Sequence, residues 1–154
     1  MKLIRADFFQ AINGLEKYSY DLIIADIHWT LLWNYEHVFK ELKSLLKDDG
    51  FLVVTVDSSR SILALIVYLE IGVNIFDINE VAVFDDGEIW SNIIVFMNKR
   101  NEPMTAKPRL PVISHFEKGK GIHTNSKDKK LYEMIVDTFS KEGDKVLDPF
   151  MGEG

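Results

Sequence analysis

The sequence predicts an α/β fold in which a mostly parallel sheet has helices on both faces and an antiparallel hairpin at one edge. Three observations favour this fold. The apolar runs "YDLIIA" and "FLVVTV" have strand length and are typical of strands covered on both faces. Segments with helical spacing of apolar residues alternate with these runs. Two later β-rich runs are joined by "DDGE", whose Asp86-Gly87 pair favours a tight turn and predicts the hairpin.

The expected elements follow one another along the whole chain. We expect a short strand over 2–7, a helix after Asp7, a strand over 20–25, a helix over 33–47, a strand over 51–56, a helix through Leu69, hairpin strands over 73–84 and 89–98, a helix over 128–141, and a last strand from Lys145. No internal repeat interrupts this order.

Local signals support the helices of the first half. Asp7 can accept a hydrogen bond as an N-cap, and the apolar residues after it share one side of a helix: Phe8, Phe9, Ile12 and Leu15. The segment 33–47 has the most regular helical spacing, and Asp49-Gly50 is expected to end it. The apolar face predicted for this helix consists of Tyr35, Val38, Phe39, Leu42, Leu45 and Leu46.

The second half contains one helix with a clear start, one long loop and one amphipathic helix. Ser58 or Ser59 can cap the helix that follows "FLVVTV", and Gly72 is expected to break it. Residues 98–126 are rich in proline and lack periodicity, which predicts a long loop. The helix over 128–141 presents Leu131, Met134, Ile135 and Phe139 on one face.

Composition places limits on the kind of protein. The chain has 154 residues, of which 47% are hydrophobic, so we expect residues 1–154 to form a single domain. It has no cysteine, which leaves no disulfide, no thiolate metal site and no cysteine nucleophile. The longest apolar stretch, Ile62–Leu69, is far too short to span a membrane. We therefore expect a cytoplasmic protein without a membrane partner.

The net charge of −6 is distributed unevenly along the chain. Residues 99–130 contain nine basic and three acidic side chains, about +6, which leaves about −12 for the remainder. Two interpretations are open: a solvated loop, or a strip that contacts the phosphates of a nucleic acid. The candidate nucleic-acid-binding residues are Lys99, Arg100, Lys107, Arg109, Lys118 and Lys120.

Acidic residues follow the predicted strands at three places, and in parallel sheets this is where ligands bind. The places are Asp7, "DIHW" from Asp26, and "DPFMGEG" from Asp148. The last of these is a short apolar run that leads into Asp-Pro and a G-x-G pair, a pattern typical of a strand followed by a tight ligand-binding turn. Asp26 and Trp29 also have purely structural interpretations: Asp26 as a strand-end cap and Trp29 as an aromatic residue of the core.

With these motifs the sequence resembles the permuted DNA amino-methyltransferases, in which a D-P-P-Y motif comes early and a D-P-F-x-G-x-G loop comes late. "LIRAD…YDLIIAD", "FKELKSLLKDDGFLVV", "SNIIVFMNK" and "HTNSKDKKLYEMIV" are similar to further parts of that family, so the resemblance extends along nearly the whole chain. It implies a Rossmann-like methyltransferase sheet, S-adenosylmethionine as cofactor, and methylation of adenine N6 or cytosine N4 in DNA.

The resemblance assigns roles at the early motif. An aromatic amine is a poor nucleophile, so its N–H groups must be held by acceptors while the base stacks on an aromatic ring. Asp26 matches the carboxylate acceptor, the carbonyl of Ile27 the backbone acceptor, and Trp29 the stacking ring. Here Ile27 and His28 replace both prolines of the family motif, so the loop is less constrained, and His28 is a candidate substitute base.

The resemblance also implies a cofactor site. Its residues are Asp7, His123, Asp148, Pro149, Phe150, Gly152 and Gly154. The sequence ends after the first half of the cofactor loop, so we expect weak binding of S-adenosylmethionine and an open sheet edge. A homo-oligomer or a completing partner is expected to cover that edge.

Three functions remain open from the sequence alone. The first is a DNA methyltransferase or a degenerate relative of one. The second is a catalytically inactive protein that binds nucleic acid or assists assembly on the same fold. The third is a methyltransferase that acts on RNA or on a protein glutamine, because an amide nitrogen presents the same electronic problem.

Overall fold

A computed structural model describes residues 4, 6–27, 34–57, 62–85, 90–98, 110 and 129–151. The elements are α1 (Phe8–Ile12), β1 (Tyr20–Ala25), α2 (Tyr35–Leu45), β2 (Leu46–Asp57), α3 (Ile62–Ile75), β3 (Phe76–Asp85), β4 (Trp90–Asn98), α4 (Lys129–Phe139) and β5 (Val146–Leu147). No helix among the described residues has the length and hydrophobicity needed to cross a bilayer.

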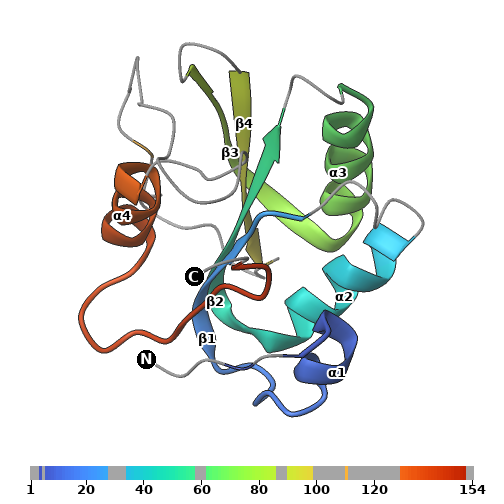
Figure 1. Ribbon diagram of the computed structural model, residues 1–154, viewed down its shortest axis with the longest axis vertical. Helices are drawn as coiled ribbons and strands as arrows, with labels where there is room; N and C mark the ends of the chain where they lie inside the picture. The colour runs from blue at the N-terminus through green and yellow to red at the C-terminus, as the bar shows by residue number, and fades with distance from the viewer. Residues whose placement is uncertain are drawn as a thin grey trace.

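The strands form one sheet in the order β3-β4-β2-β1-β5. β1 is parallel to both β2 and β5, whereas β4 is antiparallel to its neighbours β2 and β3. The expected α/β fold, with a mostly parallel sheet and an antiparallel hairpin at one edge, is confirmed. Helices α1, α2 and α3 lie on one side of the sheet and α4 lies on the other (Figure 1).

Each face of the sheet has its own apolar core. Along β1 the side chains alternate, so Ile23 and Ala25 face the α2/α3 layer and Leu22 and Ile24 face α4. All four are almost completely buried. This double burial explains the continuous apolar run that predicted the strand from sequence.

The helix α2 confirms the most regular helical pattern in the sequence. Every residue of its expected apolar face is buried against the sheet. The helix ends at Leu45, two residues earlier than expected, because Leu46 takes an extended conformation and begins β2. Asp49-Gly50 therefore lies within β2, where Leu46 pairs with Tyr20.

The expected end of α3 is wrong. The helix continues past Leu69 to Ile75, and Gly72 lies inside it. Gly72 is buried and faces the ring of Phe96 on β4, where a Cβ atom would come within 2.3 Å of the ring. The glycine therefore allows a close approach of helix and sheet. Because α3 is longer than expected, β3 begins at Phe76 instead of residue 73.

At the N-terminus the expected strand over 2–7 is not observed at its described residues. Ile4 and Ala6 lie outside any strand, and 45% of Ile4 is exposed. The expected cap is confirmed, because Asp7 Oδ1 accepts a hydrogen bond from the Phe9 N–H at 3.0 Å. Ile4 is not buried in a core, and the short apolar pair at residues 3–4 does not by itself specify a strand.

The carboxylate of Asp21 connects the amino ends of β1, β2 and β5. It pairs with Lys47 Nζ at 2.7 Å and accepts a hydrogen bond from the Lys145 backbone N–H at 2.9 Å. Burial alone would raise the pKa of Asp21, but these interactions outweigh it and lower the pKa below 3.8. The resulting stability is present above that value and is lost as the pH falls through the lower pKa of the folded state.

We expect Asp21→Asn to lower the free energy of unfolding at neutral pH by about 1 kcal/mol, because a charge-assisted contact between strands is lost. Urea titrations should show the difference shrinking as the pH falls below 3.8. Glu36→Gln is the matched control, since its pair with Lys40 is exposed on α2. If Asp21→Asn lowered the free energy of unfolding equally at neutral pH and below pH 3.8, the Asp21 charge would not stabilise the fold.

Candidate active site

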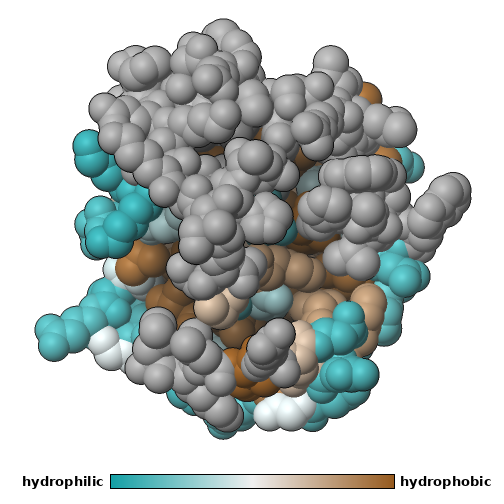
Figure 2. Space-filling model, viewed as in Figure 1, coloured by the Kyte–Doolittle hydropathy of each residue, from teal (hydrophilic) through white to brown (hydrophobic). Residues whose placement is uncertain are grey.

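Two acidic segments meet at the end of the sheet where the parallel strands finish. Asp26 follows β1, and Asp148 follows β5. These strands are parallel and adjacent, with Ile23 opposite Leu147, so their carboxyl ends lie together. Hydrophobic side chains gather at the centre of the face in Figure 2, where Figure 1 places β1 and β5. The edge at which parallel strands end is the usual ligand-binding position of such sheets.

The environment of Asp148 disfavours its charged form. Burial raises the pKa of this carboxyl to about 6, the Phe150 N–H opposes the rise by donating to Oδ1 at 2.9 Å, and the nearby charge of Asp26 adds to it. The charge of Asp26 acts on Asp148, in keeping with the adjacent carboxyl ends of β1 and β5. Asp148 therefore titrates close to neutral pH, a property that is frequent in functional sites.

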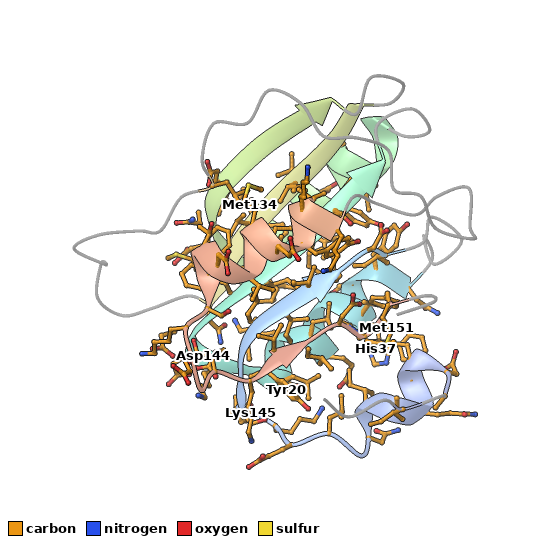
Figure 3. All side chains as sticks on the ribbon, turned by 60° about the vertical axis from the view of Figure 1, so that its left-hand side comes forward. Tyr20, His37, Met134, Asp144, Lys145 and Met151 are labelled. Atoms are coloured by element: carbon orange, nitrogen blue, oxygen red, sulfur yellow. The ribbon has the colours of Figure 1, made fainter. Side chains whose placement is uncertain are left out.

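Aromatic contacts attach the segment after β5 to the first two helices. The ring of Phe150 stacks on Phe8 with centroids 4.8 Å apart, and Phe8 contacts Phe9 edge-on at 5.0 Å. Phe9 in turn stacks on the exposed His37 of α2 at 5.2 Å. Figure 3 shows His37 and Met151 at the same end of the molecule. These contacts hold α1, and with it Asp7, beside the Asp148 segment.

Two tyrosines that sequence reasoning missed approach Asp26 from opposite layers. The pKa of Tyr68 on α3 is raised by burial, by its hydrogen bond with Tyr35, and by the charge of Asp26. The pKa of Tyr132 on α4 is raised by burial and by the charges of Asp26 and Asp148. Tyr68 had a sequence signal: it is the single hydroxyl in an apolar helical run, and a buried hydroxyl requires a partner.

Ile27, whose carbonyl is the expected backbone acceptor, is already hydrogen-bonded. Its side chain is 5% exposed and belongs to the core on the α2/α3 face. Its carbonyl oxygen accepts a hydrogen bond from Tyr68 Oη at 3.0 Å. A carbonyl oxygen has two lone pairs, and within the part of the chain that the structure describes Tyr68 is the donor that occupies one of them.

Several expected site residues lie outside the described residues. They are His28, Trp29, His123, Gly152, Gly154 and the six basic candidates Lys99, Arg100, Lys107, Arg109, Lys118 and Lys120. Within the expected loop over 98–126, the structure describes residues 98 and 110, and Leu110 is buried against the α4 core. Its N–H donates to Glu80 Oε2 on β3 at 2.8 Å.

Comparison with known proteins places this geometry in a family context. The model of the N6/N4 methyltransferase family, described as DNA methylase, matches residues 85–154, which include the segment after β5. No curated protein is similar enough in sequence to count as a relative.

Solved structures share the fold at low sequence identity. M1.HpyAVI in complex with SAM is 20% identical, with a TM-score of 0.70 over 97% of this chain and 81% of that one. TTHA0409 from Thermus thermophilus is described as a proposed DNA modification methylase. It is 21% identical, with a TM-score of 0.68 over 97% of this chain and 79% of that one. TTHA0409 has also been solved with S-adenosyl-L-methionine, at 20% identity and a TM-score of 0.67, covering 97% of this chain and 78% of that one.

The strand order and the antiparallel β4 define an α/β fold of the Rossmann type, which the chain shares with the solved structures of M1.HpyAVI and TTHA0409. The resemblance noted in the sequence is confirmed over residues 85–154, which the family model of the N6/N4 DNA methylases matches.

Proposed function

We propose that the protein is an S-adenosylmethionine-dependent methyltransferase that acts on adenine N6 or cytosine N4 in DNA, with residues 1–154 working as a single domain in the cytoplasm. The observation that carries the proposal is the meeting of Asp26 and Asp148 at the carboxyl ends of two adjacent parallel strands, inside a DNA methylase fold. The family match includes the Asp148 segment, and the fold neighbours include SAM complexes.

The described residues fit this cofactor chemically. Bound S-adenosylmethionine supplies an electrophilic methyl group, and it carries a cationic ammonium and a cationic sulfonium. Asp148 offers a desolvated carboxylate beside the aromatic ring of Phe150, which suits a cation with apolar surroundings. Asp7 has one oxygen engaged with its own helix and is a weaker candidate for contact with the adenine end.

The early motif serves the nucleophile in this proposal. Asp26 accepts one N–H of the target amino group and the free lone pair of the Ile27 carbonyl accepts the other. These bonds would return electron density to the nitrogen. Methyl transfer would break the bond between the methyl carbon and the sulfonium of the cofactor, which leaves a neutral thioether, and the Asp26 carboxylate would take up the proton that the nitrogen loses. Trp29 would stack on the base turned out of the duplex, and the six basic candidates would contact phosphates.

Cofactor binding should depend on the protonation of Asp148. Only the ionised carboxylate attracts a cation, and its pKa is raised to about 6. We therefore expect the affinity for S-adenosylmethionine to rise about tenfold between about pH 5 and about pH 7. Calorimetric titrations would measure this dependence.

The matched variants for this prediction are Asp148→Asn and Asp144→Asn. Asp148→Asn should bind weakly at both pH values, because its side chain cannot ionise. Asp144 lies at the opposite end of β5, where Figure 3 labels it, so its variant should keep the wild-type dependence. A Kd that does not change with pH in the wild type would contradict the assignment of Asp148 to the cofactor.

The proposed activity is tested by transfer of a labelled methyl group to duplex DNA, followed by identification of the modified base. Methylated adenine or cytosine is the expected product. Transfer to RNA or to a protein glutamine without DNA would favour the third class of function. Failure to bind labelled S-adenosylmethionine at all would favour an inactive binding or assembly protein and would overturn the proposal.

We also propose that the chain associates with a second copy through the outer edge of β5. Among the described strands, β5 pairs with β1 alone. Apolar side chains in β5 and shortly after it are exposed, Val146 at 41% and Met151 at 38%. Exposed edges next to apolar surface are pairing sites, and two-fold dimers are the commonest solution.

Light scattering should therefore give about twice the chain mass of 17.8 kDa. Val146→Lys, a charge on the outer edge, should shift the protein towards the single-chain mass while the helical content stays the same. Particles of 17.8 kDa alone in the wild type at micromolar concentration would contradict association.

A further inference from the structure

The hydrogen bond between Tyr68 and Ile27 links the core of the α2/α3 layer to the proposed substrate site. Tyr68 is 1% exposed, and its ring packs edge-on against Tyr35 at 4.5 Å and against Phe39 at 5.8 Å. These contacts fix the ring, so the hydroxyl is a donor with a defined position. It reaches Ile27 across 41 residues of sequence.

The Ile27 carbonyl needs such a donor. β1 ends at Ala25, so this carbonyl lies beyond the ladder of the sheet while its residue remains buried. A buried carbonyl without a partner is costly, and the Tyr68 hydroxyl supplies that partner at 3.0 Å. A bond to one lone pair also fixes the plane of the peptide, and thereby the direction of the other lone pair.

The identity of residue 28, a histidine, affects how strongly the direction of the Ile27 carbonyl depends on Tyr68. A proline at 28 would confine ψ of residue 27 to the extended region and would hold the carbonyl direction through the backbone. Histidine imposes no such restriction. A contact from elsewhere in the fold can therefore set the direction of the Ile27 carbonyl, and among the described residues that contact comes from Tyr68.

We propose that Tyr68 is a positioning residue for methyl transfer, which aims the free lone pair of the Ile27 carbonyl at the target amino group. This inference rests on the proposed function. Tyr68 contacts neither substrate nor cofactor in this role and acts through the backbone of Ile27. The aligned carbonyl and the Asp26 carboxylate together provide two acceptors for the two N–H bonds of an exocyclic amine.

The test is a double-mutant cycle between Tyr68→Phe and His28→Pro, read out as methyl transfer to duplex DNA. Tyr68→Phe should lower kcat at least tenfold while KM for S-adenosylmethionine stays unchanged. In the His28→Pro background the same change should cost less than threefold, because the backbone then holds the carbonyl. Tyr20→Phe is the matched control, since Tyr20 lies at the opposite end of β1 (Figure 3) and should retain wild-type kcat.

A second variant covers the case in which His28→Pro does not fold. Incorporation of p-aminophenylalanine at position 68 keeps a donor on the same ring and should restore kcat to within threefold of the wild type. Recovery supports the positioning role, and its absence overturns that role. An equal loss for Tyr68→Phe in both backgrounds of the cycle would also overturn it, because Tyr68 would then act only through general packing.

Failure of the inference can be separated from failure of the proposed function. A wild-type protein that transfers methyl groups, together with an inactive Asp26→Ala variant and a fully active Tyr68→Phe variant, would overturn the role of Tyr68 alone. A wild-type protein without transfer, or an Asp26→Ala variant with full transfer, would overturn the proposed function and this inference with it.

Discussion

Asp26→Ala is expected to abolish methyl transfer while the fold is retained. Asp26 lies just beyond β1, in a position where its charge influences Tyr68, Tyr132 and Asp148. In the proposed reaction its carboxylate holds the target amine, so its loss should lower kcat by about 10³-fold or more. Single-turnover transfer of labelled methyl groups to DNA would measure this change.

Asp48→Ala is the matched control for this variant. Asp48 is an exposed acid on β2, and its replacement should leave both transfer and stability unchanged. The denaturation midpoint of Asp26→Ala should stay at or above that of the wild type, because removing one carboxylate relieves repulsion with Asp148. Turnover in Asp26→Ala at the wild-type rate would place the reaction elsewhere.

Gly72→Ala is expected to lower the stability of the protein more than Asp21→Asn does. A Cβ at this position would lie 2.3 Å from Cε1 and 2.4 Å from Cζ of Phe96. Phe96 is fully buried and packs against Phe39 and Phe76, so its ring has no space into which it can turn. We expect the free energy of unfolding to fall by about 3 kcal/mol, as measured in urea.

Two further variants isolate the steric cause. Gly14→Ala is the control, because the nearest atom to its Cβ is the Ala11 carbonyl oxygen at 3.6 Å, an ordinary contact. Phe96→Leu in the Gly72→Ala background should recover part of the lost stability, since the smaller side chain makes room. If Gly72→Ala instead stabilised the protein through its helix propensity, the close packing of α3 on β4 would be wrong.

The sequence predicts those elements whose burial pattern is local. β1 is found within its expected bounds because all of its core positions are apolar, and α2 because its buried residues recur at helical spacing. α3 is different: it is apolar on all sides, so periodicity gives no boundary, and Gly72 has the same appearance as a helix terminator. The ring of Phe96 on β4, 24 residues later, is what explains that glycine.

The same distinction applies to the site. Asp26 and Asp148 could be identified because they directly follow strands, a local feature of the sequence. Tyr68 and Tyr132 could not be connected to them, because α3 and α4 reach Asp26 only through the packing of two layers on the sheet. The raised pKa of Asp148 likewise depends on burial by residues distant in the sequence.

The position of β5 in the chain has a consequence for the timing of synthesis. Four neighbouring strands, β3-β4-β2-β1, come from residues 20–98, whereas the strand that carries Asp148 begins at Val146. A ribosome that has released the first hundred residues has therefore provided most of the sheet but only one of the two carboxylates. The layer of α2 and α3 can pack on these four strands while the chain is still being made, whereas the core on the α4 side and the proposed cofactor site are completed only by the last third of the chain.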